Sequence, residues 1–175
     1  MNELLKLLRR RRSVRTYSGE HVTEEQLDQI LEAALLSMSG RAAYPCELVA
    51  VRDRETLRAL TACRTGAAGM LAGADCAVAV IGSEAVADTV VEDASIMMTQ
   101  MHLMAESLGL GSCWIQIRGR KAADGQSSED CGRAVLGIPA DRRFEAILSI
   151  GVPAGHPAGR SVNVREDRRV HREHY

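Results

Sequence analysis

Residues 76–117, CAVAVIGSEAVADTVVEDASIMMTQMHLMAESLGLGSCWIQI, decide the fold of this chain. The opening run CAVAVI, residues 76–81, is almost continuously apolar, which is typical of a strand covered on both faces. A long helix is expected over 87–108, and it ends at Gly109-Leu110-Gly111 because glycine favours the left-handed conformation that closes helices. CWIQI at 113–117 predicts a second core strand. A long helix between two core strands indicates a protein built of packed layers.

The predicted long helix is apolar nearly all round. Its apolar residues are too many for one core stripe: Val90, Ala94, Met97, Met98, Met101, Met104, Ala105 and Leu108. A helix of this kind is buried on more than one side. In a chain of 175 residues we expect the second side to pack against a partner subunit.

The flanking sequence adds shorter elements. Thr23 and Gln26 form a capping box that opens a helix whose apolar residues repeat at helical spacing through Leu35. Further helices are expected over 2–11, from Asp53 to 63, and from Ser127 or Ser128 to 136, with strands over 47–52 and 146–152. Helices and strands intermix without regular βαβ alternation, which favours an α+β layered sheet with antiparallel pairs.

A chain of 175 residues and 19.0 kDa fits one domain. We place that domain over 1–153. Beyond Pro153 the sequence offers little to bury, so residues 154–175 are expected to form a tail that is disordered or wrapped around something else.

Charge is distributed unevenly along the chain. The chain has 22 Lys and Arg residues and 23 Asp and Glu residues. Residues 1–15 contain six of the basic residues and one of the acidic residues, which leaves 16 basic and 22 acidic residues in the rest of the chain. Binding to a nucleic-acid backbone depends on an extended basic surface, which a body with excess acid does not provide. The local positive charge suits one small anion better, and we expect no nucleic-acid partner.

The cysteines and the apolar stretches bear on metal binding and on the cellular compartment of the protein. Cys46, Cys63, Cys76, Cys113 and Cys131 are odd in number and lack zinc-site spacing, so we expect reduced thiols and no metal site. The Leu4–Leu8 patch is followed, not preceded, by arginines, so no signal peptide is expected. The apolar stretch 86–108 contains charged residues throughout, which argues against a membrane partner. A cytoplasmic location is expected.

The segment Arg11-Arg12-Ser13-Val14-Arg15 offers what a phosphate needs: guanidinium groups for paired contacts and a hydroxyl. In an extended segment Arg11, Ser13 and Arg15 point to the same side and converge on one ligand. The alternative is a basic helix end that interacts with the helix dipole. No glycine-rich phosphate loop of the GxGxxG or GxxxxGK type is present, so side chains would have to hold a nucleotide-like ligand.

A series of motifs resembles the FMN-dependent nitroreductase family over residues 8–153. It runs from RRSVRTY through an alanine-rich helix, the Ser39-Gly40-Arg41 loop and Pro45 before a strand to GLGSCWIQIR and SIGVP, and the ending VHREHY resembles a compact branch of that family. The resemblance implies a three-layer α/β/α fold with a mixed, mostly antiparallel sheet flanked by helices. It also implies a homodimer in which the tail wraps the partner subunit.

The resemblance implies FMN-binding roles for particular residues. Arg11 and Ser13, with Arg12 assisting, would hold the phosphate and ribityl end, and Arg15 would lie near the pyrimidine edge, where a cation stabilises anionic reduced flavin.

Other residues follow from the same resemblance. Ser39, Gly40 and Arg41 would reach the flavin from the other protomer, and Trp114, Ile115 and Gln116 would line its face through backbone groups and the Gln116 side chain. Gly151 would lie near the phosphate, with Arg160 of the tail as a further candidate. No catalytic residue is assigned, because the cofactor carries the chemistry and solvent supplies protons. Arg9 and Arg10 are expected to be solvated.

The implied function is an NAD(P)H oxidoreductase with ping-pong kinetics, in which NADH or NADPH reduces FMN and a nitroaromatic, quinone or similar small-molecule acceptor is reduced in turn. Two alternatives stay open. One is another flavin reaction on the same fold: dehalogenation, flavin fragmentation or flavin carriage. The other is a nucleic-acid-binding module with a basic N-terminal arm. Cys46 stands where many family members have Trp, which leaves the neighbouring loop geometry open.

Overall fold

The computed structural model describes residues 2–165 and 167–175. Four strands form one sheet in the order β1-β2-β4-β3. The strands are β1 (Cys46–Val51), β2 (Cys76–Gly82), β3 (Gly111–Gln116) and β4 (Arg143–Gly151). Each of the three neighbouring pairs is antiparallel, and the parallel pairing of the mixed sheet is an isolated bridge between Ser13 and Ser112.

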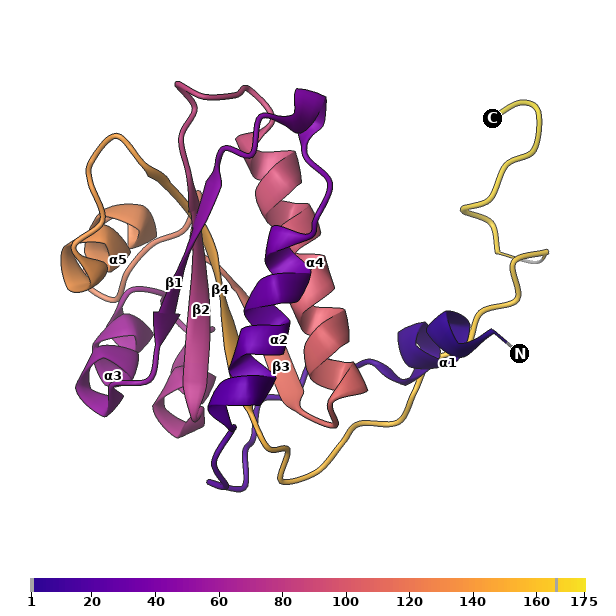
Figure 1. Ribbon diagram of the computed structural model, residues 1–175, viewed down its shortest axis with the longest axis horizontal. Helices are drawn as coiled ribbons and strands as arrows, with labels where there is room; N and C mark the ends of the chain where they lie inside the picture. Colours follow the sequence, from indigo (N-terminus) through magenta and orange to yellow (C-terminus); the bar gives the residue numbers. More distant parts are fainter. Residues whose placement is uncertain (1, 166) are drawn as a thin grey trace.

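Helices cover both faces of the sheet (Figure 1). α2 (Glu24–Leu35) and α4 (Val90–Ser107) lie on one face, and α3 (Arg54–Ala62) and α5 (Ser128–Leu136) lie on the other. Every residue of β2 is buried, and its side chains alternate between two apolar clusters, one on each face. The predicted three-layer α+β fold is therefore confirmed, and the predicted core strand lies in its middle layer.

Local signals set the helix ends. The capping box is present in full: the Thr23 side chain accepts a hydrogen bond from the Gln26 amide, and the Gln26 side chain accepts one from the Thr23 amide. Asp53 and Ser127 cap α3 and α5 through their side chains. Gly137 ends α5 with a φ of 67°, in the left-handed region that glycine adopts without strain.

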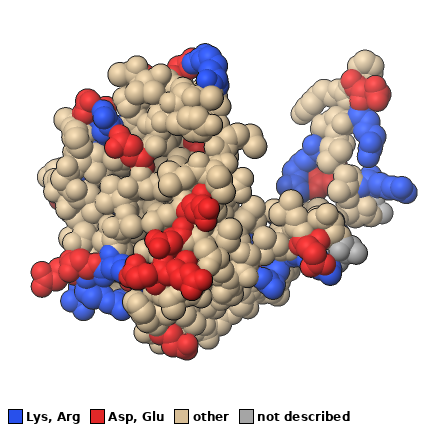
Figure 2. Space-filling view, in the orientation of Figure 1, with Lys and Arg blue, Asp and Glu red and all other residues tan. Residues whose placement is uncertain are grey.

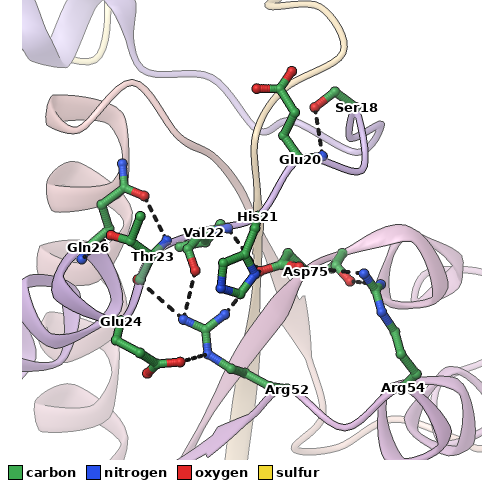
Figure 3. Close-up of polar contacts among 11 residues, drawn as sticks. Ser18, Glu20, His21, Val22, Thr23, Glu24, Gln26, Arg52, Arg54 and Asp75 are labelled. Atoms are coloured by element: carbon green, nitrogen blue, oxygen red, sulfur yellow. Dashed lines mark hydrogen bonds and ion pairs between the residues drawn. The ribbon is translucent and has the colours of Figure 1, made fainter.

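A polar cluster ties the start of α2 to the sheet (Figure 3). The Asp75 carboxylate accepts hydrogen bonds from the Val22 amide at 3.0 Å and from Arg52 Nη1 at 3.0 Å. Arg52 also donates to the Val22 carbonyl at 2.9 Å, and Arg54 donates to the Ala74 carbonyl at 2.7 Å. These bonds satisfy backbone groups of the entering loop and hold α2 in place over the sheet.

One sequence expectation for the cysteines is wrong. Cys63 and Cys131 form a disulfide, with Cα atoms 5.3 Å apart, although 68 positions separate them in the sequence. Cys63 caps the C-terminal end of α3 and Cys131 lies within α5, and these two helices share one face of the sheet. The spacing of cysteines in the sequence carries no trace of this proximity. Cys46, Cys76 and Cys113 are free thiols.

The arm, defined here as α1 (Glu3–Arg10) and the tail from Pro153 onward, projects from the layered body (Figure 1). The two segments are joined where the Arg160 amide donates to the Arg9 carbonyl at 2.7 Å. Arg12, two residues beyond α1, also contacts the tail, where its Nη1 donates to the Ala158 carbonyl at 3.2 Å. Lys and Arg side chains are prominent on the arm, whereas Asp and Glu gather on the lower part of the body (Figure 2).

The arm also exposes apolar side chains, from both its helix and its tail: Leu4, Leu5, Leu8, Val162, Val164 and Val170. Among the described helices, none combines the length and apolar character required to cross a membrane.

Candidate functional site: a basic cavity between the arm and the sheet edge

Four arginines line one cavity where the arm meets the body. The cavity has a volume of about 550 Å³ and is lined by Leu8, Arg11, Arg12, Ser13, Arg15, Pro157 and Arg160. The structure thus brings together the residues of the Arg-rich segment and the one arginine of the tail that the sequence singled out. A concentration of guanidinium groups around a shared space attracts an anion.

The Arg-rich segment is held as an extended strip along the edge of the sheet. The Val14 amide donates to the Ser112 carbonyl at 2.9 Å, and the Ser18 amide donates to the Val152 carbonyl at 2.8 Å. Val14 is buried, so its neighbours Ser13 and Arg15 are directed away from the core. Arg11, Ser13 and Arg15 line one cavity as expected, but Arg12 lines it as well, so alternation alone does not select the residues that face it.

Two glycines make room for this strip. A Cβ at Gly111 would lie 2.7 Å from Val14 Cγ1, and a Cβ at Gly151 would lie 2.7 Å from Tyr17 Cδ1. The Tyr17 hydroxyl donates to the Val14 carbonyl at 3.1 Å. Gly151, expected near the phosphate, thus packs beneath the Tyr17 ring and sets the path of the strip.

His102 is a site residue that sequence reasoning missed. It lies on α4, is buried, and reaches Arg11 Nη1 with Nε2 at 3.2 Å and Ser112 Oγ with Nδ1 at 2.5 Å. Burial, followed by the charge of Arg11, lowers the pKa of His102 to about 4. The available signal was a histidine among the methionines of a helix expected to be buried on more than one side.

Arg10 is exposed, as expected, but it also forms an ion pair that the sequence did not predict. Arg10 Nε lies 2.6 Å from Glu106 Oε1, and Arg10 Nη2 donates to the Glu106 carbonyl at 2.8 Å. His156 Nε2 binds the other carboxylate oxygen at 2.9 Å. Glu106 is buried, so a charged partner is required to stabilise it, and Arg10 is the arginine within reach. Arg9 is half-buried and its carbonyl accepts the Arg160 amide.

The Ser39-Gly40-Arg41 loop lies at the other end of α4 and does not line the basic cavity of the same chain. Asp93 accepts hydrogen bonds from Ser39 Oγ at 2.6 Å and from the Gly40 amide at 3.2 Å. Asp93 precedes His102 by nine residues on one helix, which corresponds to roughly 13 Å along the axis.

The three predicted residues of β3 differ in what they offer. Trp114 is half-buried, and its Nε1 donates to Gln116 Oε1 at 2.9 Å. The Gln116 amide nitrogen donates to the buried Glu145 carboxylate at 2.9 Å, so this side chain is satisfied within the chain. Ile115 is buried in the cluster on the α3 and α5 face.

Because β3 is an edge strand and alternate residues direct their backbone groups to opposite sides, the outward backbone groups are those of Ser112, Trp114 and Gln116. The Gln116 side chain is engaged within the chain, and the backbone groups of these three residues lie at the strand edge.

Cys46 is half-buried, and burial, followed by the charge of Asp93, raises its pKa to about 12. Its thiol donates weakly to the Val90 carbonyl at 3.6 Å. The thiolate form that reacts is thus disfavoured. Cys46 is a packing residue at the start of β1.

Comparisons with known proteins agree with this architecture. The sequence profile of the nitroreductase family matches residues 8–63 and 58–152. A provisionally named NADH dehydrogenase/NAD(P)H nitroreductase of Archaeoglobus fulgidus is 31% identical over 181 residues, covering 99% of both chains. The structure of an FMN-dependent nitroreductase from Clostridium difficile R20291 is 35% identical with a TM-score of 0.92, covering 98% of this chain and 99% of the other.

A third similar structure, a provisionally named nitroreductase from Desulfovibrio desulfuricans in complex with FMN, is 26% identical with a TM-score of 0.79. The match covers 100% of this chain and 99% of the other. The profile match, the identities and the shared three-layer fold have one explanation: this chain belongs to the nitroreductase family.

Proposed function

We propose that the protein is an FMN-dependent oxidoreductase that uses NADH or NADPH to reduce nitroaromatics, quinones or similar electron-poor acceptors. The observation that carries the proposal is the basic cavity, in which Arg11, Arg12, Ser13, Arg15 and Arg160 surround one space beside the edge of β3. The names of similar proteins, FMN-dependent nitroreductase and NAD(P)H nitroreductase, support the same activity.

The residues of the cavity fit the chemistry of FMN. Its phosphate dianion matches the guanidinium groups of Arg11, Arg12 and Arg160 and the hydroxyl of Ser13. Arg15, two residues along the strip from Ser13, adds a further positive charge to the same cavity. A cavity of about 550 Å³ is within the size range of cofactor sites.

When bound, FMN supplies hydride transfer from the reduced nicotinamide and electron transfer to the acceptor. The chain contributes binding and electrostatics. The arginines hold the anionic end, Arg15 favours negative charge on the ring system, and the backbone groups of Trp114 and Gln116 at the strand edge orient the ring by hydrogen bonding. Solvent delivers the protons.

The functional unit is a homodimer. The exposed leucines of α1 and valines of the tail form apolar surface that a second subunit would cover. The tail wraps the partner, and a two-fold arrangement brings the Ser39-Gly40-Arg41 loop of one subunit toward the basic cavity of the other. Sedimentation equilibrium of the full chain is expected to give a dimer, and a monomer that binds FMN would contradict this arrangement.

The decisive experiment compares Arg11→Ala/Arg15→Ala with Arg58→Ala, a control at an exposed position on α3. Purified wild-type protein is expected to show flavin absorbance that bleaches on anaerobic addition of NADH or NADPH and returns with a quinone. The double variant is expected to lose FMN while the control keeps it. FMN retained as tightly by the double variant as by the control would refute the assignment.

Bound flavin that NADH and NADPH leave oxidised would instead favour flavin carriage, dehalogenation or flavin fragmentation on the same fold. The arrangement of the arginines around one cavity supports a small anionic ligand over a nucleic-acid backbone.

A further inference from the structure

We propose that His102 is a positioning residue for the flavin site: its neutral imidazole orients Arg11 without neutralising it. The proposal rests on the proposed role of Arg11 in binding FMN. It concerns a residue on α4 that lies behind the basic cavity rather than in its lining.

The hydrogen bonds of His102 define its tautomer. A guanidinium group has only donors, so the 3.2 Å contact between Arg11 Nη1 and His102 Nε2 requires Nε2 to accept. The ring proton then resides on Nδ1, which donates to Ser112 Oγ at 2.5 Å. A doubly protonated ring would place an N–H against the Arg11 donor. The geometry therefore specifies the neutral, Nδ1-protonated form.

The groups around His102 agree with this form. Arg11 and Ser112 face the ring from the Arg-rich strip and from β3, and Cys113 follows on the same strand. The nearest carboxylate along α4, Glu106, is occupied by Arg10 and His156. Burial acts in the same direction, because it disfavours the imidazolium.

Comparison with Arg10 shows the consequence of pairing Arg11 with a neutral imidazole and not with a carboxylate. Arg10 pairs with the carboxylate of Glu106, which compensates its charge and makes it a structural group. Arg11 pairs with a neutral acceptor, so its orientation is fixed while its full positive charge and its other N–H groups remain for an anion in the cavity. A carboxylate at position 102 would compete with the phosphate for the same guanidinium.

His102 also links two parts of the site. Ser112 accepts a hydrogen bond from Nδ1 of His102 through its hydroxyl. Its backbone forms the bridge with Ser13, and its carbonyl accepts a hydrogen bond from the Val14 amide. One imidazole thus contacts both Arg11 and β3, the strand to which Ser13 of the cavity is bridged. These two contacts account for a buried histidine on α4.

The test uses two substitutions of His102 that differ in reach. In His102→Gln a side-chain oxygen reaches the position of Nε2 and accepts from Arg11, whereas the shorter amide of His102→Asn retains only the contact near Nδ1. We expect His102→Asn to weaken FMN binding about tenfold, as measured by flavin fluorescence quenching on the apoprotein. His102→Gln is expected to restore binding to within about threefold of wild type.

A double-variant cycle with Arg11→Ala separates orientation from general stability. If His102 acts through Arg11, His102→Asn has little further effect once Arg11 is alanine. Equal weakening by His102→Asn in both backgrounds would overturn the proposal, as would 15N NMR showing the proton on Nε2 in the apoprotein.

The cycle also keeps the two proposals distinct. If Arg11→Ala weakens FMN binding and His102→Asn does not, the role of His102 is wrong and the flavin site stands. If Arg11→Ala binds FMN like the wild type, the role proposed for Arg11 is wrong, and the role of His102 with it.

Discussion

The Oε1 atom of Glu106 on α4 lies 2.6 Å from the Nε atom of Arg10, the last residue of α1. This ion pair fixes the point at which the chain leaves the first helix and enters the Arg-rich strip. His156 contacts the second oxygen of the same carboxylate, so the start of the tail is fastened to the same place. One buried carboxylate therefore organises the arm on both sides of the basic cavity.

Replacing Glu106 with Gln is expected to loosen the arm. Gln offers one acceptor and no charge, so Arg10 and His156 lose their common partner, and we expect a loss of about 1–3 kcal/mol in the free energy of unfolding. Urea unfolding and limited proteolysis of residues 1–15 measure the effect. Glu92→Gln, an exposed position on the same helix, serves as the control. Equal behaviour of the two variants would show that the ion pair is not structural.

The attachment of the tail is expected to weaken as pH rises above 6.5. The hydrogen bond to Glu106 raises the pKa of His156 above its ordinary value of 6.5. The contribution is thus fully present below pH 6.5 and is lost as pH rises through the raised pKa. Proteolytic cleavage of residues 157–175 should accelerate over that window. His156→Gln should cleave at a rate that no longer depends on pH there.

Titration of His102 changes stability with pH in the direction opposite to that of His156. Its pKa is lowered from 6.5 to about 4 in the folded protein, so between these values the unfolded chain binds more protons and the free energy of unfolding falls as pH falls. Urea denaturation between pH 7 and pH 4 should show this slope, and His102→Gln should flatten it. An unchanged slope in the variant would assign the effect to other groups.

Reduction of the disulfide is expected to lower stability without affecting the flavin site. A cross-link between positions 68 residues apart contributes about 4 kcal/mol by restricting the unfolded chain. A reductant should therefore lower the Tm of the wild-type protein and leave the Tm of Cys131→Ser unchanged. FMN binding should persist, because α3 and α5 lie on the face of the sheet away from the arm.

Gly111→Ala is expected to displace the Arg-rich strip. The new Cβ would lie 2.7 Å from Val14 Cγ1, too close for carbon atoms, so the strip must shift at a cost of about 1–3 kcal/mol. FMN affinity should fall with stability because Ser13 and Arg15 move with Val14. Gly69→Ala, where nothing lies within 4 Å of the new Cβ, is the matched control. Unchanged FMN affinity in Gly111→Ala would show that the position of the strip does not affect FMN binding.

Sequence by itself determined the main elements of this protein and the basic segment that lines the cavity. The apolar run of β2, the capping box at Thr23 and the alternation around Val14 depend on residues close together in the chain, and the structure contains all three. Backbone geometry imposes periods of 3.6 and 2 residues, so such patterns are readable without knowledge of the fold.

Tertiary structure alone decided which partners the charged groups take. Arg11 meets His102 across 91 positions, Arg10 meets Glu106 across 96, and Cys63 meets Cys131 across 68. These contacts depend on how α4 packs against the arm and how α3 lies beside α5, and no local period encodes that placement. The two adjacent arginines differ in their partners. Arg10 pairs with the buried carboxylate of Glu106, which makes it a structural group. Arg11 contacts the imidazole of His102, which leaves its charge for the cavity.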